Sequence, residues 1–202
     1  MPFQRVLDQY SDASCVAIDI PIGLPQGQPR HCDLQARAVL GPRRNSVFPA
    51  PDRRLLDASH YGEALARSRL ITGKGISKQT FAISHKIADV DRLMTPELQV
   101  RVVEIHPEVC FWAMAGRRPM AHHKATPEGF EERRALLLRA YEGVQIPNLY
   151  EAASLVPPAK SDDVFDAMAA AWTASHFAQR LASRFPANPP TDTRGLRMEI
   201  VF

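Results

Sequence analysis

Cysteine is scarce in this chain of 202 residues, which contains only Cys15, Cys32 and Cys110. The three form no CxxC pair, and two of them lie in apolar surroundings. This pattern is typical of reduced, buried thiols and not of a secreted domain held together by disulfides. It predicts a cytoplasmic protein.

Long apolar runs are also missing. No segment approaches the roughly 20 apolar residues that span a bilayer. Residues 1–10 are amphipathic and charged, so we expect neither a signal peptide nor a membrane partner. The composition, 45% hydrophobic and 23% charged, is ordinary for a globular protein, and the length suits a single domain over residues 1–202.

Three catalytic motifs are absent as well. The chain has seven histidines but no HExxH, and His122 and His123 are adjacent, which disfavours a zinc hydrolase. No GxSxG occurs, and the cysteines have no evident partner base, which disfavours nucleophilic catalysis. The basic loop 72–78 contains two glycines but not the P-loop spacing GxxxxGKS or GxxxxGKT.

Two short apolar runs predict buried strands over 15–20 and 101–106. Each is followed by a proline and carries one acid near its carboxyl end, Asp19 or Glu104. The long, mainly helical connection between them favours parallel pairing, which would bring both acids to one crevice at the strand ends. Asp19 is therefore either a cleft residue or an unusually placed cap for the following turn. A third strand, at an edge of the sheet, is predicted over 196–202.

The longest predicted helix covers 161–184. Asp162 and Asp163 lie in its first turn, where acids interact favourably with the helix dipole and need no function. Asp166 lies one turn further along, within the apolar run 164–172, and shares a helix face with Asp163. A carboxylate in such surroundings needs a partner or a cation.

Four acids thus form a candidate catalytic cluster: Asp19, Glu104, Asp163 and Asp166. Clustered carboxylates repel each other, so such a group favours bound divalent cations. Oxygen ligands suit Mg²⁺ or Mn²⁺. Two such ions can activate a water and stabilise the leaving oxygen when a phosphodiester is cut.

Two basic loops are candidates for binding substrate phosphates. They contribute Arg43 and Arg44, and Lys74 and Lys78. The net charge of +3 is compatible with a polyanionic partner but does not require one. Each lysine taken alone is better explained as a solvated residue in a connection between helices.

The chain resembles the family known as domain of unknown function 429, commonly described as predicted nucleases with an RNase H fold. The resemblance is carried by AIDIPIGLP (17–25), GPRRNSVFPAP (41–51), GKGISKQTFAISHKIADVD (73–91), VVEIHPEVCFWAM (102–114), KATPEGFEERRALL (124–137), DDVFDAMAAAWTA (162–174) and GLRMEIVF (195–202). These segments cover nearly all of the chain.

The resemblance implies an RNase H-like α/β fold, with a partial sheet of about three strands covered by helices. It implies a metal-dependent hydrolase that cuts DNA or RNA. It assigns Asp19 to the second acidic position of the site and Asp163 or Asp166 to the last, and it makes Glu104 a supporting acid.

One departure from the family pattern qualifies these expectations. An RNase H-like domain opens with a three-stranded hairpin that carries the first catalytic aspartate, and no such hairpin precedes the strand with Asp19. The domain is therefore expected to be truncated at its N-terminus relative to the family, with a strand edge open to self-association. The alternative function is a catalytically inactive protein that binds nucleic acid or a nucleotide.

Overall fold

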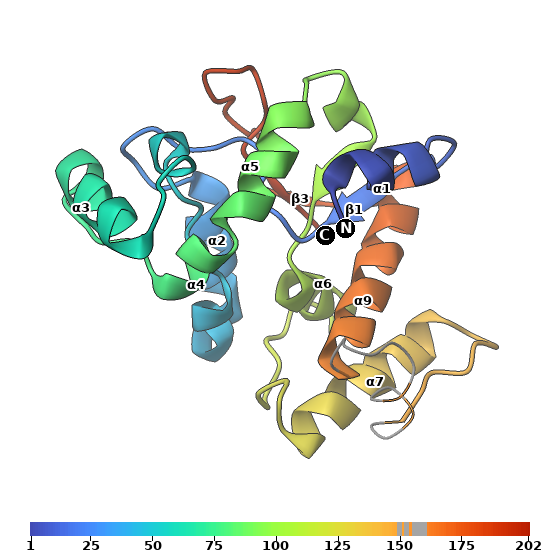
Figure 1. The fold of residues 1–202 in the computed structure, drawn as a ribbon. Coiled ribbons are helices and arrows are strands. Elements are labelled where there is room, and N and C mark those ends of the chain that lie inside the picture. Colours follow the sequence, from blue (N-terminus) through green and yellow to red (C-terminus); the bar gives the residue numbers. More distant parts are fainter. Residues whose placement is uncertain (149–150, 152–153, 155–160) are drawn as a thin grey trace.

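The computed structural model describes residues 1–148, 151, 154 and 161–202 (Figure 1). It is an α/β structure in which helices surround a small sheet. Its helical segments are α1 Phe3–Gln9, α2 His31–Leu40, η1 Gly41–Ser46, η2 Arg53–Leu55, α3 Tyr61–Thr72, α4 Lys78–Ala82, α5 Ser84–Leu93, η3 Leu98–Val100, α6 Pro107–Met114, α7 Pro127–Ala140 and α9 Ser161–Ala178. Within the described residues, no helix is long and apolar enough to cross a membrane.

The sheet is built around β2, Val102–Glu104. On one side β2 pairs in parallel with β1, Val16–Ile18, which confirms the predicted parallel arrangement. On the other side a parallel bridge joins Ile105 to Val201 of β4, Ile200–Val201. β4 in turn pairs antiparallel with β3, Arg184–Phe185. All three predicted strands are thus present in shortened form. They belong to two two-stranded sheets, β1–β2 and β3–β4, which the bridge between Ile105 and Val201 joins.

The predicted helix over 161–184 ends early, at Ala178. Arg180 adopts a positive φ of 61°, and the backbone N–H of Leu181 donates to the carbonyl of His176. This left-handed step reverses the chain, as is common where helices end. Residues 184–185 are thereby released to form β3.

The two faces of β2 pack against different parts of the chain. Val103 and Ile105 join a core cluster with Phe165 and Ala169 of α9. Val102, which points the other way, joins a cluster that includes Phe3 of α1. The alternation follows from the two-residue period of a strand. The strand ends are therefore held between two separate hydrophobic clusters.

Candidate active site

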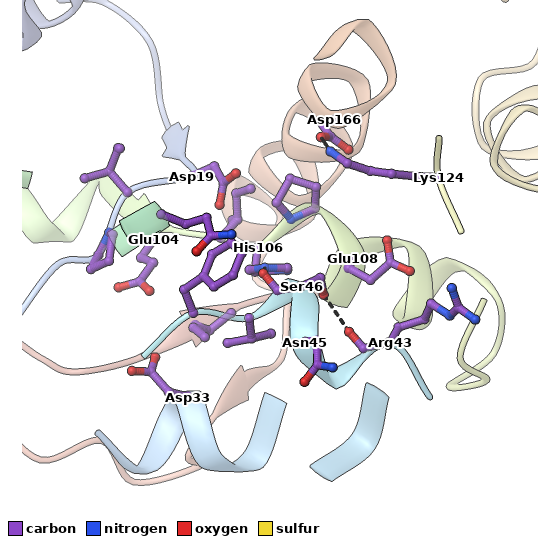
Figure 2. A pocket seen from close by; sticks show the side chains of 18 of the residues that line it. Asp19, Asp33, Arg43, Asn45, Ser46, Glu104, His106, Glu108, Lys124 and Asp166 are labelled. Carbon is purple, nitrogen blue, oxygen red and sulfur yellow. Dashed lines mark hydrogen bonds and ion pairs between the residues drawn. The ribbon is translucent and has the colours of Figure 1, made fainter. Parts of the chain in front are cut away.

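A cavity of about 760 Å³ opens where β1 and β2 end. Figure 2 shows side chains that line it, which come from the ends of both strands, from η1, from α6, from α9 and from the loop before α7. This is the crevice at the carboxyl ends of parallel strands in which open α/β sheets bind ligands. The cavity is therefore where the predicted site residues must be sought.

Asp19 and Glu104 both line this cavity but project from opposite faces of the sheet. The register pairs Ile18 with Glu104, so these two side chains lie on one face. Asp19 follows Ile18 and projects from the other face, toward α9. Figure 2 shows the two carboxylates pointing in different directions.

The structure brings Asp19 and Asp166 to the same cavity. The Asp19 carboxylate is exposed to the cavity solvent, yet protein atoms surround it on most sides, and this desolvation raises its pKa. The imidazole of His106, when it is protonated, and the ammonium of Lys124 act in the opposite direction. Burial raises the pKa of Asp166 to about 6, and the charge of Asp19 contributes to that rise. The two acids thus disfavour each other's ionised form, which a shared cation would relieve.

The helix acids form a compact group of oxygen donors. Asp162, Asp163 and Asp166 each offer one oxygen within 4.8 Å of the others. Their donor set, all carboxylate oxygen, fits a hard divalent cation. Asp163 is the most exposed member and does not line the cavity, whereas Asp166 does.

A lysine already contacts this group. The Lys124 Nζ lies 2.7 Å from an Asp166 oxygen and 2.9 Å from an Asp162 oxygen. Figure 2 shows the amine directed at Asp166. The surrounding carboxylates raise the pKa of Lys124 above its ordinary value, although its partial burial opposes this. A positive charge is therefore accommodated where the acids converge.

Glu104 has a different set of partners. It is buried, and its two oxygens each accept a hydrogen bond of 2.7 Å from the Arg30 guanidinium. The backbone N–H of Ile22 also donates to it at 2.7 Å. Burial raises the pKa of Glu104 to about 7, even though Arg30 opposes the shift. Arg30 further contacts Asp33, so the three buried side chains tie the turn after β1 to α2 and to β2.

His106, which the sequence analysis did not single out, also lines the cavity. Its Nε2 lies 3.2 Å from the carbonyl oxygen of Ser46 and must donate, because a carbonyl can only accept. In the neutral ring the other nitrogen, Nδ1, is then an acceptor, and it has no partner within the described residues. A signal was available from its position, because His106 lies two residues beyond the end of β2 and Asp19 lies directly beyond the end of β1.

Unpartnered buried nitrogens are concentrated at this cavity. Within the described residues, three buried side-chain nitrogens lack a hydrogen-bond partner, and they belong to Arg43, His106 and Arg133. All three residues line the cavity. Buried polar groups are nearly always satisfied in native proteins, and exceptions tend to mark functional sites. This distribution indicates a site built for a polar ligand.

The basic loops contribute less to the cavity than expected. Arg43 lines it, but Arg44, Lys74 and Lys78 do not. The Lys78 amine lies instead 6.0 Å from the centroid of the Tyr61 ring. The remaining positive charge at the cavity comes from residues that were not singled out as phosphate ligands, namely Arg30, Lys86, Lys124 and Arg133.

Comparisons with known proteins give one finding. A comparison with curated proteins and a comparison with solved structures gave no match. Residues 2–191 match the model of a family described as "Protein of unknown function (DUF429)". Because this match spans most of the chain, the chain belongs to the DUF429 family.

Proposed function

We propose that this protein is a divalent-metal-dependent nuclease with an RNase H-like arrangement of acids. One observation carries the proposal: Asp19, from the end of β1, and Asp166, from α9, line one cavity, and both have raised pKa values. Such carboxylates have an electrostatic need for a cation. The oxygen donors of the neighbouring Asp162 and Asp163 support a site for Mg²⁺ or Mn²⁺.

In this proposal Asp166 holds the metal together with Asp162 or Asp163, whose oxygens lie within 4.8 Å of it. Asp19, which is not a member of that group but lines the same cavity as Asp166, is the further ligand. A bound divalent cation supplies positive charge to the phosphate oxygens and lowers the pKa of water. Arg43 and Lys86 line the cavity and would bind phosphates on either side of the cut. His106, with its Nε2 committed to the carbonyl of Ser46, can accept a proton at Nδ1. Glu104 holds Arg30 and the turn after β1, and so positions Asp19 without touching the substrate.

The proposal predicts cleavage that depends on a metal. Labelled DNA and RNA strands, single and paired, would be incubated with the protein and Mn²⁺, Mg²⁺ or EDTA and resolved by electrophoresis. Cleavage is expected with Mn²⁺ or Mg²⁺ and none in EDTA, because the acids act only through the ion. Absence of cleavage of every substrate under every metal condition would reject the nuclease.

A second candidate, a nucleic-acid or nucleotide-binding protein without catalysis, is favoured by one observation. Lys124 already places an ammonium against Asp162 and Asp166, so their charge is partly neutralised without a metal. A protein that never binds a metal would benefit from this arrangement. The two candidate functions predict different effects of Lys124→Met on metal binding.

We expect Lys124→Met to tighten Mn²⁺ binding, lowering the Kd about tenfold, because the ion no longer competes with an ammonium at the same oxygens. Isothermal titration calorimetry at pH 8 measures this. Lys86→Met is the matched control. Lys86 lines the same cavity but, among the described residues, forms no ion pair with an acid. Failure of both wild type and Lys124→Met to bind Mn²⁺ would favour the binding protein.

A further inference from the structure

The wall of the cavity carries an exposed aromatic ring, that of Phe48. Phe48 is 44% exposed to solvent. Of the large apolar residues that are exposed in the described part of the chain, Phe48 is the one that lines the cavity. No ring–ring contact in that part of the chain includes it. A solvent-facing ring in the wall of a cavity that also carries cations offers a flat face on which a planar ligand can stack.

The backbone on both sides of Phe48 is fixed. The carbonyl of Val47 accepts a hydrogen bond of 2.6 Å from Arg37. The backbone N–H of Ala50 donates to buried Asp33 at 2.9 Å. Val47 itself is buried in a core cluster with Leu40 of α2. The ring is therefore presented from a rigid support, and ligand binding would require little ordering of this segment.

The residues around Phe48 suit a nucleotide. Gln79 lines the same cavity and offers amide donors and an acceptor for the edge of a base. Arg43 and Lys86 add positive charge for phosphate. An aromatic face, polar groups for base edges and nearby cations are the means by which proteins bind unpaired nucleotides.

The size of the cavity argues for an unpaired strand. Its volume of about 760 Å³ lies in the range of pockets that enclose one small molecule, roughly 300–1,000 Å³. A duplex keeps its bases stacked inside, so no base face is available to a side chain unless the base is extruded. A single strand can place an unstacked base in the cavity directly.

We propose that the cavity binds single-stranded nucleic acid, with one unstacked base lying on the Phe48 ring next to the phosphate that is cut. The position of this base beside the phosphate that is cut rests on the proposed function. The stacking contact does not depend on it. Base stacking on a side-chain ring accepts either sugar, so DNA and RNA strands are both candidates until they are compared.

Binding of fluorescent 12-nucleotide single strands, measured by anisotropy in EDTA, tests the inference without any cleavage. Phe48→Ala is expected to raise the Kd about 5- to 100-fold, the effect of losing one stacked base. Phe48→Trp is expected to retain binding, and Phe48→Leu is expected to behave like Phe48→Ala, because the contact needs a ring. The acids repel phosphate equally in all of these variants, so the ratios remain informative.

Leu34→Ala is the matched control, because Leu34 is 52% exposed on α2 but does not line the cavity. DNA and RNA strands of one sequence decide between the two sugars. Unchanged binding by Phe48→Ala, no binding of any strand, or equal affinity for a duplex would overturn the inference. Phe48-dependent binding without metal-dependent cleavage would leave the inference standing and reject the nuclease. Metal-dependent cleavage that Phe48→Ala leaves unchanged would overturn the inference and leave the nuclease standing.

Discussion

Asp19→Asn is expected to reduce metal-dependent cleavage by about a thousand-fold or more, because it removes a carboxylate proposed to hold the ion. The amide keeps the size of the side chain but carries no charge. Single-turnover cleavage with saturating protein measures the chemical step. Asp12→Asn, at an exposed acid outside the cavity, is the matched control and should cleave at the wild-type rate.

The same variant should not lose stability. Burial raises the pKa of Asp19 in the folded protein, so at any pH where the group is ionised it disfavours the folded state relative to the unfolded chain. Removing that charge should leave the metal-free unfolding temperature at pH 8 unchanged or higher. A structural acid would show the opposite result, a lower unfolding temperature together with lost activity.

Glu104→Ala is expected to lower the free energy of unfolding by about 3–5 kcal/mol, since it breaks a buried ion pair and leaves part of its partner's charge uncompensated. Arg30 loses two of its hydrogen bonds and the Ile22 N–H loses its acceptor. Urea unfolding followed by circular dichroism measures the change. Asp57→Ala, which removes an exposed ion pair with Arg67, should change stability by less than about 1 kcal/mol.

Glu104→Gln separates the shape of this group from its charge. The amide can still accept hydrogen bonds, so the loss should be smaller, roughly 1–3 kcal/mol. Because the pKa of Glu104 is raised to about 7, wild-type stability falls as pH rises toward 7 and the glutamine variant lacks this dependence. The stability difference between the two should therefore shrink from pH 5 to pH 8. A difference that grows over this interval would show that the ion pair outweighs burial.

The local features of the fold could be predicted from the sequence. Apolar runs closed by Pro21 and Pro107 identified β1 and β2, and the long connection identified their parallel pairing. The convergence of Asp19 and Asp166 on one crevice was also anticipated, because both the strand end and the late helix were recognisable. These inferences need only periodicity and the general geometry of parallel sheets.

The remaining features depend on register and on contacts distant in sequence. Whether Glu104 shares a face with Asp19 depends on a shift of one residue between the strands, which no pattern in either strand encodes. The partner of Glu104, Arg30, lies 74 positions away. The end of α9 was missed because a non-glycine residue, Arg180, takes the left-handed conformation there.

The turn after β1 also has an evolutionary consequence. Gly23 has a positive φ of 72°, and a Cβ at this position would lie 2.7 Å from the carbonyl oxygen of Arg197. Any side chain would force the turn away from the last segment of the sheet, whatever the chemistry of the cavity. Gly23, Arg30 and Glu104 should therefore persist in relatives that have lost catalysis, whereas Asp19 and Asp166 should drift. Descendants that have become pure binding proteins would then be recognisable by which of these two groups of positions has been retained.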